Sequence, residues 1–264
     1  MSVTIHPSAV VDPAAKLGEG VFVGPFCAVG PNVELGDNVR LLSHVAIDGR
    51  TRVGEGTVIY PFASIGHPPQ DLKYRGEPSE LIIGRRNQIR EHVTMSPGTE
   101  GGGMVTRVGD NGLFMVGVHV AHDCVVGDNA VLANNATLAG HVELGDFVTI
   151  GGLSAVHQFV RIGSHAMIGG MSGVEKDVIP YGLVMGERAR LAGLNLIGLE
   201  RRGFQKDDIH ALRAAYRMLF GPEGTFAERV DEVVRDFGEK TLVTDVLEFI
   251  RSKASRSLCQ PRES

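Results

Sequence analysis

Aliphatic residues recur at every sixth position over most of the chain between Ile5 and Val174. The first run extends from Ile5 to Ile65, and the pattern resumes in the same phase at Ile83. After a second interruption it returns one residue out of step at Val108. An α-helix repeats every 3.6 residues and an isolated strand every 2 residues, so neither element accounts for a period of six.

A parallel β-helix produces this period, because each hexapeptide supplies one short strand and one turn and three hexapeptides complete a triangular coil. Position i then stacks beneath position i+18, and successive coils rise by about 4.8 Å. A sandwich of short strands would instead repeat every 8–12 residues or so, with alternating polarity. We therefore predict a mainly β fold, a left-handed parallel β-helix of hexapeptide repeats, over residues 1–184.

The two interruptions of the repeat predict external loops at about residues 66–80 and 97–104. The first is polar and proline-rich between His67 and Pro78, and the second contains the run Gly101-Gly102-Gly103. Loops that leave a rigid scaffold often carry binding residues. Both loops are therefore candidates for ligand contacts.

Beyond residue 184 the apolar spacing becomes helical, which predicts a C-terminal α-helical domain over residues 185–264. Thr225 and Glu228 form a candidate capping box at the start of one helix. One helix is expected before this box, around Ile209, Leu212, Tyr216 and Leu219. Another is expected after the capped helix, from Leu242 to Ser252. The polar tail from Ser255 is expected to be loose.

Composition and charge exclude several functions. The net charge of -5 and the pI near 6.1 argue against nucleic acid as a partner. We find neither the pattern of a signal peptide nor an apolar stretch long enough to cross a bilayer, so no transmembrane segment is expected. The cysteines Cys27, Cys124 and Cys259 are isolated, which is typical of reduced thiols in a cytoplasmic protein.

Histidines cluster in the middle of the chain, at positions His119, His122, His141 and His157. The 18-residue register places His122 beneath Gly140, and Gly140 beneath Gln158, with about 4.8 Å between successive positions. His141 and His157 are each one position away from this line. One edge of the prism thus gathers several polar side chains.

Two chemistries fit this edge. In one, His122 is a general base that takes a proton from a hydroxyl group. Asp123 would orient the imidazole as a triad carboxylate does, provided that both residues lie on a turn, since adjacent strand residues point opposite ways. The Gly140 backbone N–H is a candidate oxyanion donor, although a plain turn glycine fits the pattern equally well. In the other chemistry, three histidines bind a metal ion as in zinc hydratases.

Five segments carry a resemblance to a known family, at residues 70–78, 121–124, 132–142, 155–159 and 201–204. They read QDLKYRGEP, AHDC, LANNATLAGHV, AVHQF and RRGF. The chain resembles the UDP-N-acetylglucosamine O-acyltransferases, which use acyl carrier protein as acyl donor in the first step of lipid A biosynthesis, a part of lipopolysaccharide assembly. The resemblance covers essentially the whole chain, including the helical region.

The resemblance implies transfer of a 3-hydroxyacyl chain from acyl carrier protein to the 3-hydroxyl of UDP-N-acetylglucosamine (UDP-GlcNAc), with no metal and no cofactor. His122 would be the general base, Asp123 would support it, and the Gly140 amide would stabilise the oxyanion. The family forms homotrimers with the sites in clefts between subunits. Gly170 matches the position that limits acyl-chain length, and a glycine there predicts a longer donor because it leaves the groove open.

The resemblance also implies three groups of substrate-binding residues. Asp71, Lys73, His119 and His141 would hold the GlcNAc and adjoining groups, Gln70, His157 and Gln158 would contact other parts of the substrates, and Asn195, Arg201 and Arg202 would face the nucleotide phosphates. Arginine suits that last role because its paired N–H groups match a phosphate.

Two departures from the family leave the acceptor open. Ser96-Pro97-Gly98-Thr99 stands where relatives carry His-Arg-Gly-Thr, and Arg188 stands where a histidine is common. A 3-amino analogue of the sugar is therefore an alternative acceptor. An alternative from a different class is a trimeric zinc-dependent hydratase like carbonic anhydrase, which uses the same prism. It would need His119, His122 and His141 on one metal ion.

Overall fold

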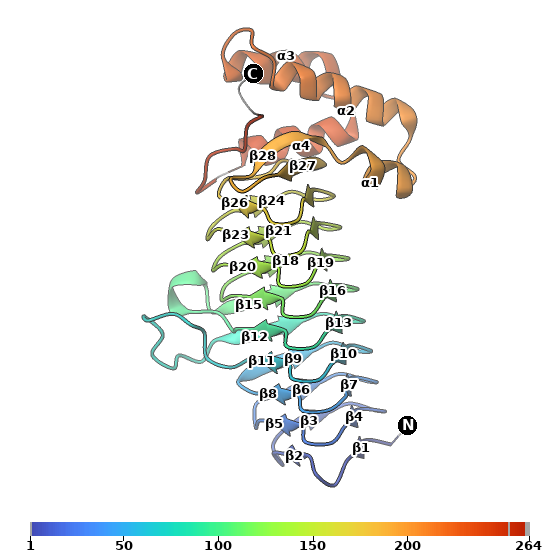
Figure 1. Cartoon of the computed structure of the whole chain (residues 1–264), viewed down its shortest axis with the longest axis vertical. Coiled ribbons are helices and arrows are strands. Elements are labelled where there is room, and N and C mark those ends of the chain that lie inside the picture. Colours follow the sequence, from blue (N-terminus) through green and yellow to red (C-terminus); the bar gives the residue numbers. More distant parts are fainter. Residues whose placement is uncertain (1, 253, 262–264) are drawn as a thin grey trace.

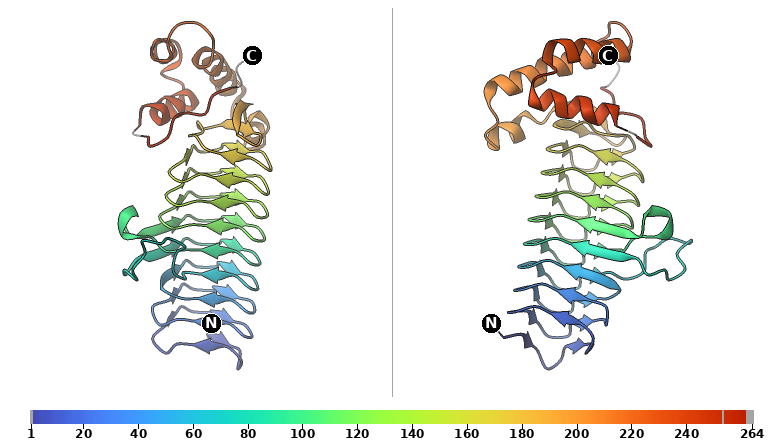
Figure 2. Two further views of the ribbon diagram at one scale, coloured as in Figure 1. Left: turned by 60° about the vertical axis from the view of Figure 1, so that its left-hand side comes forward. Right: turned by 180° about the vertical axis from the view of Figure 1, so that it is seen from behind.

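The computed structural model describes residues 2–252 and 254–261 and shows a tall β-helix with α-helices across its C-terminal end (Figure 1). Three sheets, which we name A, B and C, form the faces of the prism. Two loops leave the prism on one side, and the N-terminus lies at the end far from the helices (Figure 2). The predicted left-handed parallel β-helix with a C-terminal helical part is confirmed.

The sheets are built from very short strands. Sheet A has 11 strands, in the order β1 (Thr4–Ile5), β4 (Phe22–Val23), β7 (Arg40–Leu41), β10 (Val58–Ile59), β13 (Gln88–Ile89), β16 (Leu113–Phe114), β19 (Val131–Leu132), β22 (Thr149–Ile150), β25 (Met167–Ile168), β27 (Gly182–Met185) and β28 (Arg190–Leu194). Sheet B has 9 strands, β2 (Val10–Val11), β5 (Ala28–Val29), β8 (Ala46–Ile47), β11 (Ser64–Ile65), β14 (Thr94–Met95), β17 (His119–Val120), β20 (Thr137–Leu138), β23 (Ala155–Val156) and β26 (Gly173–Val174). Sheet C has 8 strands, β3 (Lys16–Leu17), β6 (Glu34–Leu35), β9 (Arg50–Val53), β12 (Glu80–Ile83), β15 (Val105–Val108), β18 (Val125–Val126), β21 (Glu143–Leu144) and β24 (Arg161–Ile162).

The register explains both interruptions of the repeat. In an uninterrupted coil Val120 pairs with Leu138, eighteen residues on. Ile65 pairs with Met95, a step of thirty residues that keeps the six-residue phase because it adds twelve. Met95 pairs with Val120, a step of twenty-five that adds seven and so shifts the phase by one. The repeat therefore shifts by one residue because the second loop adds seven residues and not a multiple of six.

The second residue of each two-residue strand points into the prism and is buried along most of its height. Leu132, Leu138 and Ile150 have no exposed surface, whereas their strand neighbours Val131 and Thr137 are partly exposed. Burial of one such aliphatic side chain contributes about 1.5–3 kcal/mol. The stack of inward side chains is thus the main source of stability.

The helical part consists of α1 (Leu196–Arg201), α2 (Lys206–Leu219), α3 (Phe226–Phe237) and α4 (Thr241–Arg251), and the second loop contains the short 3-10 helix η1 (Glu100–Gly102). The capping box is confirmed, since the Thr225 hydroxyl accepts from the Glu228 N–H and the Glu228 carboxylate accepts from the Thr225 N–H. Along residues 2–252 and 254–261, no helix has the length and apolarity needed to cross a membrane.

The expectation of a loose tail from Ser255 is wrong for residues 257–260. The Asp177 N–H donates to the Ser257 carbonyl oxygen at 2.9 Å, and the Cys259 N–H donates to the Asp177 carbonyl oxygen at 2.7 Å. The Leu191 N–H donates to the Gln260 carbonyl oxygen at 3.0 Å. The chain therefore returns from the helices and pairs with the last coil.

Adjacent valines of β18 offer a direct test of this packing. Val126 points inward and is 2% exposed, whereas Val125 points outward and is 44% exposed. We expect Val126→Ala to lower the free energy of unfolding by about 2 kcal/mol. The matched control Val125→Ala should change it by less than about 0.5 kcal/mol. Urea unfolding followed by circular dichroism measures both, and equal losses would contradict the assigned register.

Candidate functional site

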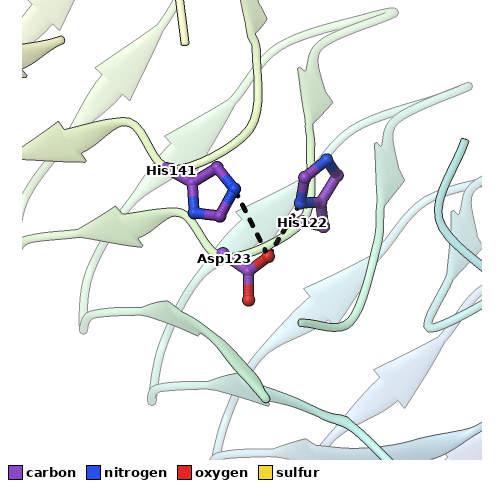
Figure 3. A group of neighbouring side chains, drawn as sticks. All are labelled: His122, Asp123 and His141. Atoms are coloured by element: carbon purple, nitrogen blue, oxygen red, sulfur yellow. Dashed lines mark hydrogen bonds and ion pairs between the residues drawn. The ribbon is translucent and has the colours of Figure 1, made fainter. Parts of the chain in front are cut away.

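The candidate site lies at the corner where the chain passes from sheet B to sheet C. His122 and Asp123 form the turn after β17, and Asp123 has a left-handed backbone with φ of 60°. This turn lets two neighbouring side chains face each other, which a strand would prevent. Figure 3 shows both side chains together with that of His141, which comes from the next coil.

The Asp123 carboxylate is buried and fully engaged in hydrogen bonds. Its side chain has no exposed surface. Oδ1 accepts from the Thr99 N–H at 2.8 Å, and Oδ2 accepts from the Thr99 hydroxyl at 2.6 Å. The Asp123 N–H donates to the Thr106 hydroxyl at 2.7 Å. The second loop therefore holds this carboxylate in one orientation.

Asp123 in turn orients the imidazole of His122. Its Oδ2 lies 2.8 Å from His122 Nδ1. Because a carboxylate can only accept, Nδ1 carries the proton and Nε2 is left with a lone pair. The His122 side chain is 18% exposed, so a ligand can reach it. The pair thus presents a basic nitrogen at the surface.

Gly140 lies directly against this imidazole. A Cβ atom at Gly140 would stand 2.5 Å from His122 Cε1 and 2.7 Å from Nε2, closer than any real contact. Since the backbone here is not left-handed, the glycine is needed for space and not for its φ angle. Within the described chain no group accepts the Gly140 N–H, which leaves it free to bind a ligand oxygen.

His141 completes the corner. Its ring meets His122 edge-on with centroids 5.1 Å apart and stacks on Phe159 at 4.4 Å. Its Nε2 is 3.9 Å from Asp123 Oδ2. Burial lowers the pKa of His141, although the Asp123 carboxylate opposes this effect. His141 is therefore neutral near pH 7 and can donate or accept a hydrogen bond.

His119 and the first loop flank the corner. His119 Nδ1 lies 2.7 Å from the Thr94 hydroxyl, and burial lowers the pKa of His119. Asp71 Oδ1 accepts from the Lys73 N–H at 2.9 Å, so these two residues form a tight turn. The charges of Asp71 and Lys73 both act on the pKa of His141, in opposite directions. Gln70 is exposed in the same loop.

Gln158 and Phe159 form the corresponding turn above Gly140 and His141, and His157 immediately precedes this turn. The Phe159 N–H donates to the Gly140 carbonyl oxygen at 3.2 Å, which confirms the stacking of Gln158 on Gly140 expected from the register. Arg256, from the tail, bonds to both His157 and Gln158: Nη2 lies 2.9 Å from His157 Nδ1, and Nε donates to the Gln158 carbonyl oxygen at 3.1 Å.

The residues expected to face nucleotide phosphates lie elsewhere on the prism. Asn195, Arg201 and Arg202 line a groove of about 750 Å³ over the outer side of sheet A. The Asn195 side chain caps α1, accepting from the Gly198 N–H at 3.1 Å. Arg202 donates to the Phe147 carbonyl oxygen at 3.2 Å, while Arg201 is exposed. Sheet A is opposite the corner that holds His122, so one chain does not bring these two sets together.

Gly170 occupies a third place, the corner between sheets A and B. A Cβ atom there would meet only the Gly152 backbone oxygen at 3.4 Å and its nitrogen at 3.9 Å. These are ordinary contacts, and the backbone is not left-handed. A Cβ atom at position 170 therefore fits without disturbing the coil.

The arrangement favours proton transfer over metal binding. Among the described residues, the one group of potential ligands close enough for a metal ion is His122, Asp123 and His141. His119, the third histidine of the hydratase alternative, is not part of this group. The Asp123 carboxylate already accepts three hydrogen bonds, and catalytic zinc sites need three protein ligands and an open position.

Sequence reasoning missed the groups that hold the predicted residues in place. Thr99 and Thr106 fix Asp123, Thr94 contacts His119, and Arg256 contacts His157. Thr99 lies between the departures from the family at Ser96 and Pro97 and the Gly101–Gly103 run, so its place in the second loop was a usable signal.

The fold and the corner together define an enzyme of the hexapeptide-repeat transferase class. Residues 14–49 match the model of the bacterial transferase hexapeptide (six repeats), and residues 177–259 match domain 2 of the UDP N-acetylglucosamine O-acyltransferases. The acyl-[acyl-carrier-protein]–UDP-N-acetylglucosamine O-acyltransferase of Caulobacter vibrioides is 57% identical over 98% of both chains.

Solved structures agree. LpxA from Acinetobacter baumannii is 41% identical, with a TM-score of 0.91 over 97% of this chain and 99% of its own. The Arabidopsis UDP-N-acetylglucosamine acyltransferase is 40% identical, with a TM-score of 0.86 over 97% of this chain and 100% of its own. The chain therefore belongs to the UDP-N-acetylglucosamine O-acyltransferase family.

Gly140→Ala tests the close approach of backbone and imidazole. We expect the new methyl group to push the His122 ring away and to break its hydrogen bond to Asp123, because the methyl carbon would overlap the position that the ring now occupies. A crystal structure of the variant measures the distance from His122 Nδ1 to Asp123 Oδ2. Gly101→Ala is the control, since a Cβ atom there has no neighbour within 4 Å. An unmoved ring in Gly140→Ala would refute the assignment.

Proposed function

We propose that the protein transfers a 3-hydroxyacyl chain from acyl carrier protein to the 3-hydroxyl of UDP-GlcNAc, the first step of lipid A biosynthesis. The family identity supports the reaction, and one observation carries the mechanism. Buried Asp123 fixes the imidazole of His122 against Gly140, and the N–H of Gly140 has no acceptor among the described residues. A base and an oxyanion donor thus stand side by side, as acyl transfer requires.

The proposed steps follow from this geometry. His122 Nε2 removes the proton from the sugar 3-hydroxyl, and that oxygen attacks the thioester carbonyl carbon. The negative charge passes to the carbonyl oxygen, where the Gly140 N–H stabilises it. When the C–S bond breaks, the proton on His122 goes to the departing thiolate of the carrier protein. Asp123 stabilises the imidazolium throughout.

The placement of the second set of residues supports a homotrimer. Asn195, Arg201 and Arg202 lie over sheet A, and His122 lies at the opposite corner. A substrate that contacts both sets needs sheet A of one subunit to face the His122 corner of another. We therefore place the site in a cleft between subunits of a cytoplasmic trimer, with Asp71 and Lys73 reaching toward the sugar and His119 and His141 beside it.

A 3-amino analogue of UDP-GlcNAc is a second acceptor for the same site. Ser96 and Pro97 depart from the family pattern, and they lie close in sequence to Thr99, which matches the family and holds Asp123 directly. The two departures therefore adjoin the residue that fixes the carboxylate beside the base. The amine and the hydroxyl would occupy the same place against His122 Nε2, so a direct comparison of the two acceptors decides between them.

His122→Ala tests the general base. We expect wild-type protein to transfer the acyl chain and the variant to lose about a hundredfold or more in kcat, since general-base catalysis contributes about 10²–10⁴-fold. The assay measures acyl transfer from 3-hydroxyacyl carrier protein to UDP-GlcNAc. His210→Ala is a suitable control because His210 lies on the exposed side of α2.

The other outcomes of this assay distinguish the acceptor, the reaction and the role of His122. Transfer to the 3-amino analogue alone would replace the acceptor and keep the mechanism. Failure of a folded wild-type trimer with both acceptors would overturn the proposal, and stoichiometric zinc by metal analysis would then favour the hydratase. Full activity in His122→Ala would refute the role of this residue while leaving the reaction intact.

Gly170 predicts the length of the donor. Because this position leaves space for a side chain, we expect the wild type to prefer acyl chains longer than ten carbons. Gly170→Met should fill that space and shift the preference toward shorter donors with little change in thermal stability. Competition between donors of several lengths measures the preference, and a clear wild-type preference for a ten-carbon chain would contradict the prediction.

A further inference from the structure

The tail after α4 brings a cation to the edge of the candidate site. Ser257 and Cys259 pair with Asp177 of the last coil, and the Cys259 side chain is only 2% exposed. These contacts fix the backbone immediately after Arg256. The guanidinium of Arg256 is therefore held beside His157 and Gln158, which lie ninety-nine and ninety-eight positions earlier in the sequence.

The contacts of Arg256 decide which nitrogen of His157 carries the proton. Arginine can only donate hydrogen bonds, so the 2.9 Å contact between Arg256 Nη2 and His157 Nδ1 requires a lone pair on Nδ1. The proton of the neutral ring then lies on Nε2. His157 Nδ1 also lies 3.2 Å from the Gln158 carbonyl oxygen, which would favour the opposite tautomer. Arg256 opposes that alternative because a proton on Nδ1 would face the Nη2–H donor at 2.9 Å.

We propose that Arg256 is a positioning residue that holds His157 with its proton on Nε2, so that the ring donates a hydrogen bond to an acceptor oxygen of the bound substrate. This inference rests on the proposed function, in which His157 contacts substrate. His157 stands two coils above His122, about 10 Å along the prism. A donor at that distance suits a carbonyl or phosphate oxygen remote from the reacting centre and acts on binding.

A double-mutant cycle in the intact trimer tests the mechanism. We expect Arg256→Ala and His157→Ala each to raise the KM of one substrate about tenfold, the loss of one hydrogen bond, with kcat little changed. If Arg256 acts through His157, the double variant should be no worse than His157→Ala. Arg256→Lys should restore part of the loss because lysine still donates. Arg251→Ala, on the exposed side of α4, is the matched control.

Losses that multiply to about a hundredfold in the double variant would overturn the proposal, because Arg256 would then act without His157. The nitrogen chemical shifts of His157, in protein labelled at histidine, provide a readout that needs no activity. We expect the Nε2–H tautomer in the wild type and a shift toward Nδ1–H in Arg256→Ala. An unchanged tautomer would overturn the inference, even if the wild type transferred no acyl chain and the proposed function had failed.

Discussion

The corners of the coil impose the constraint on which both fold and site depend. A chain that turns three times in eighteen residues needs a left-handed residue at most corners, and many of these are not glycine. Each costs roughly 1–2 kcal/mol in backbone strain. Stacking along the corner offsets the cost: the rings of Phe147, His165 and Tyr181 follow one another at 4.8 and 5.5 Å. The corner side chains therefore form ordered columns on the outside of the prism.

The proposed chemistry uses one such column. Asp123 tolerates the left-handed backbone because its short polar side chain bonds locally. That conformation turns its carboxylate toward His122, and the coil spacing brings His141 and Gly140 above the pair. The absence of a Cβ atom at Gly140 leaves room for the imidazole, and the Gly140 N–H has no acceptor among the described residues. The proposed base, its orienting carboxylate and the proposed oxyanion donor thus follow from the same turn geometry that closes each coil.

The sequence predicts the relative positions of residues that the eighteen-residue register controls and few of the contacts outside it. His122, Gly140 and Gln158 fall on one line because their spacing is a multiple of the repeat. Thr99 and Arg256 meet Asp123 and His157 from the second loop and the tail, where the repeat does not apply. The prediction of a loose tail was wrong because the tail is ordered by pairing with the backbone of Asp177 in the last coil. No local pattern in the tail sequence reveals this pairing.

The remaining question is how one prism serves a substrate whose ends need different surroundings. The reacting end requires fixed groups, and the fully buried side chain of Asp123 is held by Thr99 and His122 of its own chain. The nucleotide end needs exposed cations, and Arg201 and Arg202 lie over sheet A, opposite that corner. A triangular prism cannot turn a face toward its own opposite corner. The proposed three-fold association would solve this, because each sheet A could then face the corner of a neighbouring subunit. In such a trimer a single chain would contain all of the proposed acid–base chemistry, whereas substrate affinity would depend on assembly.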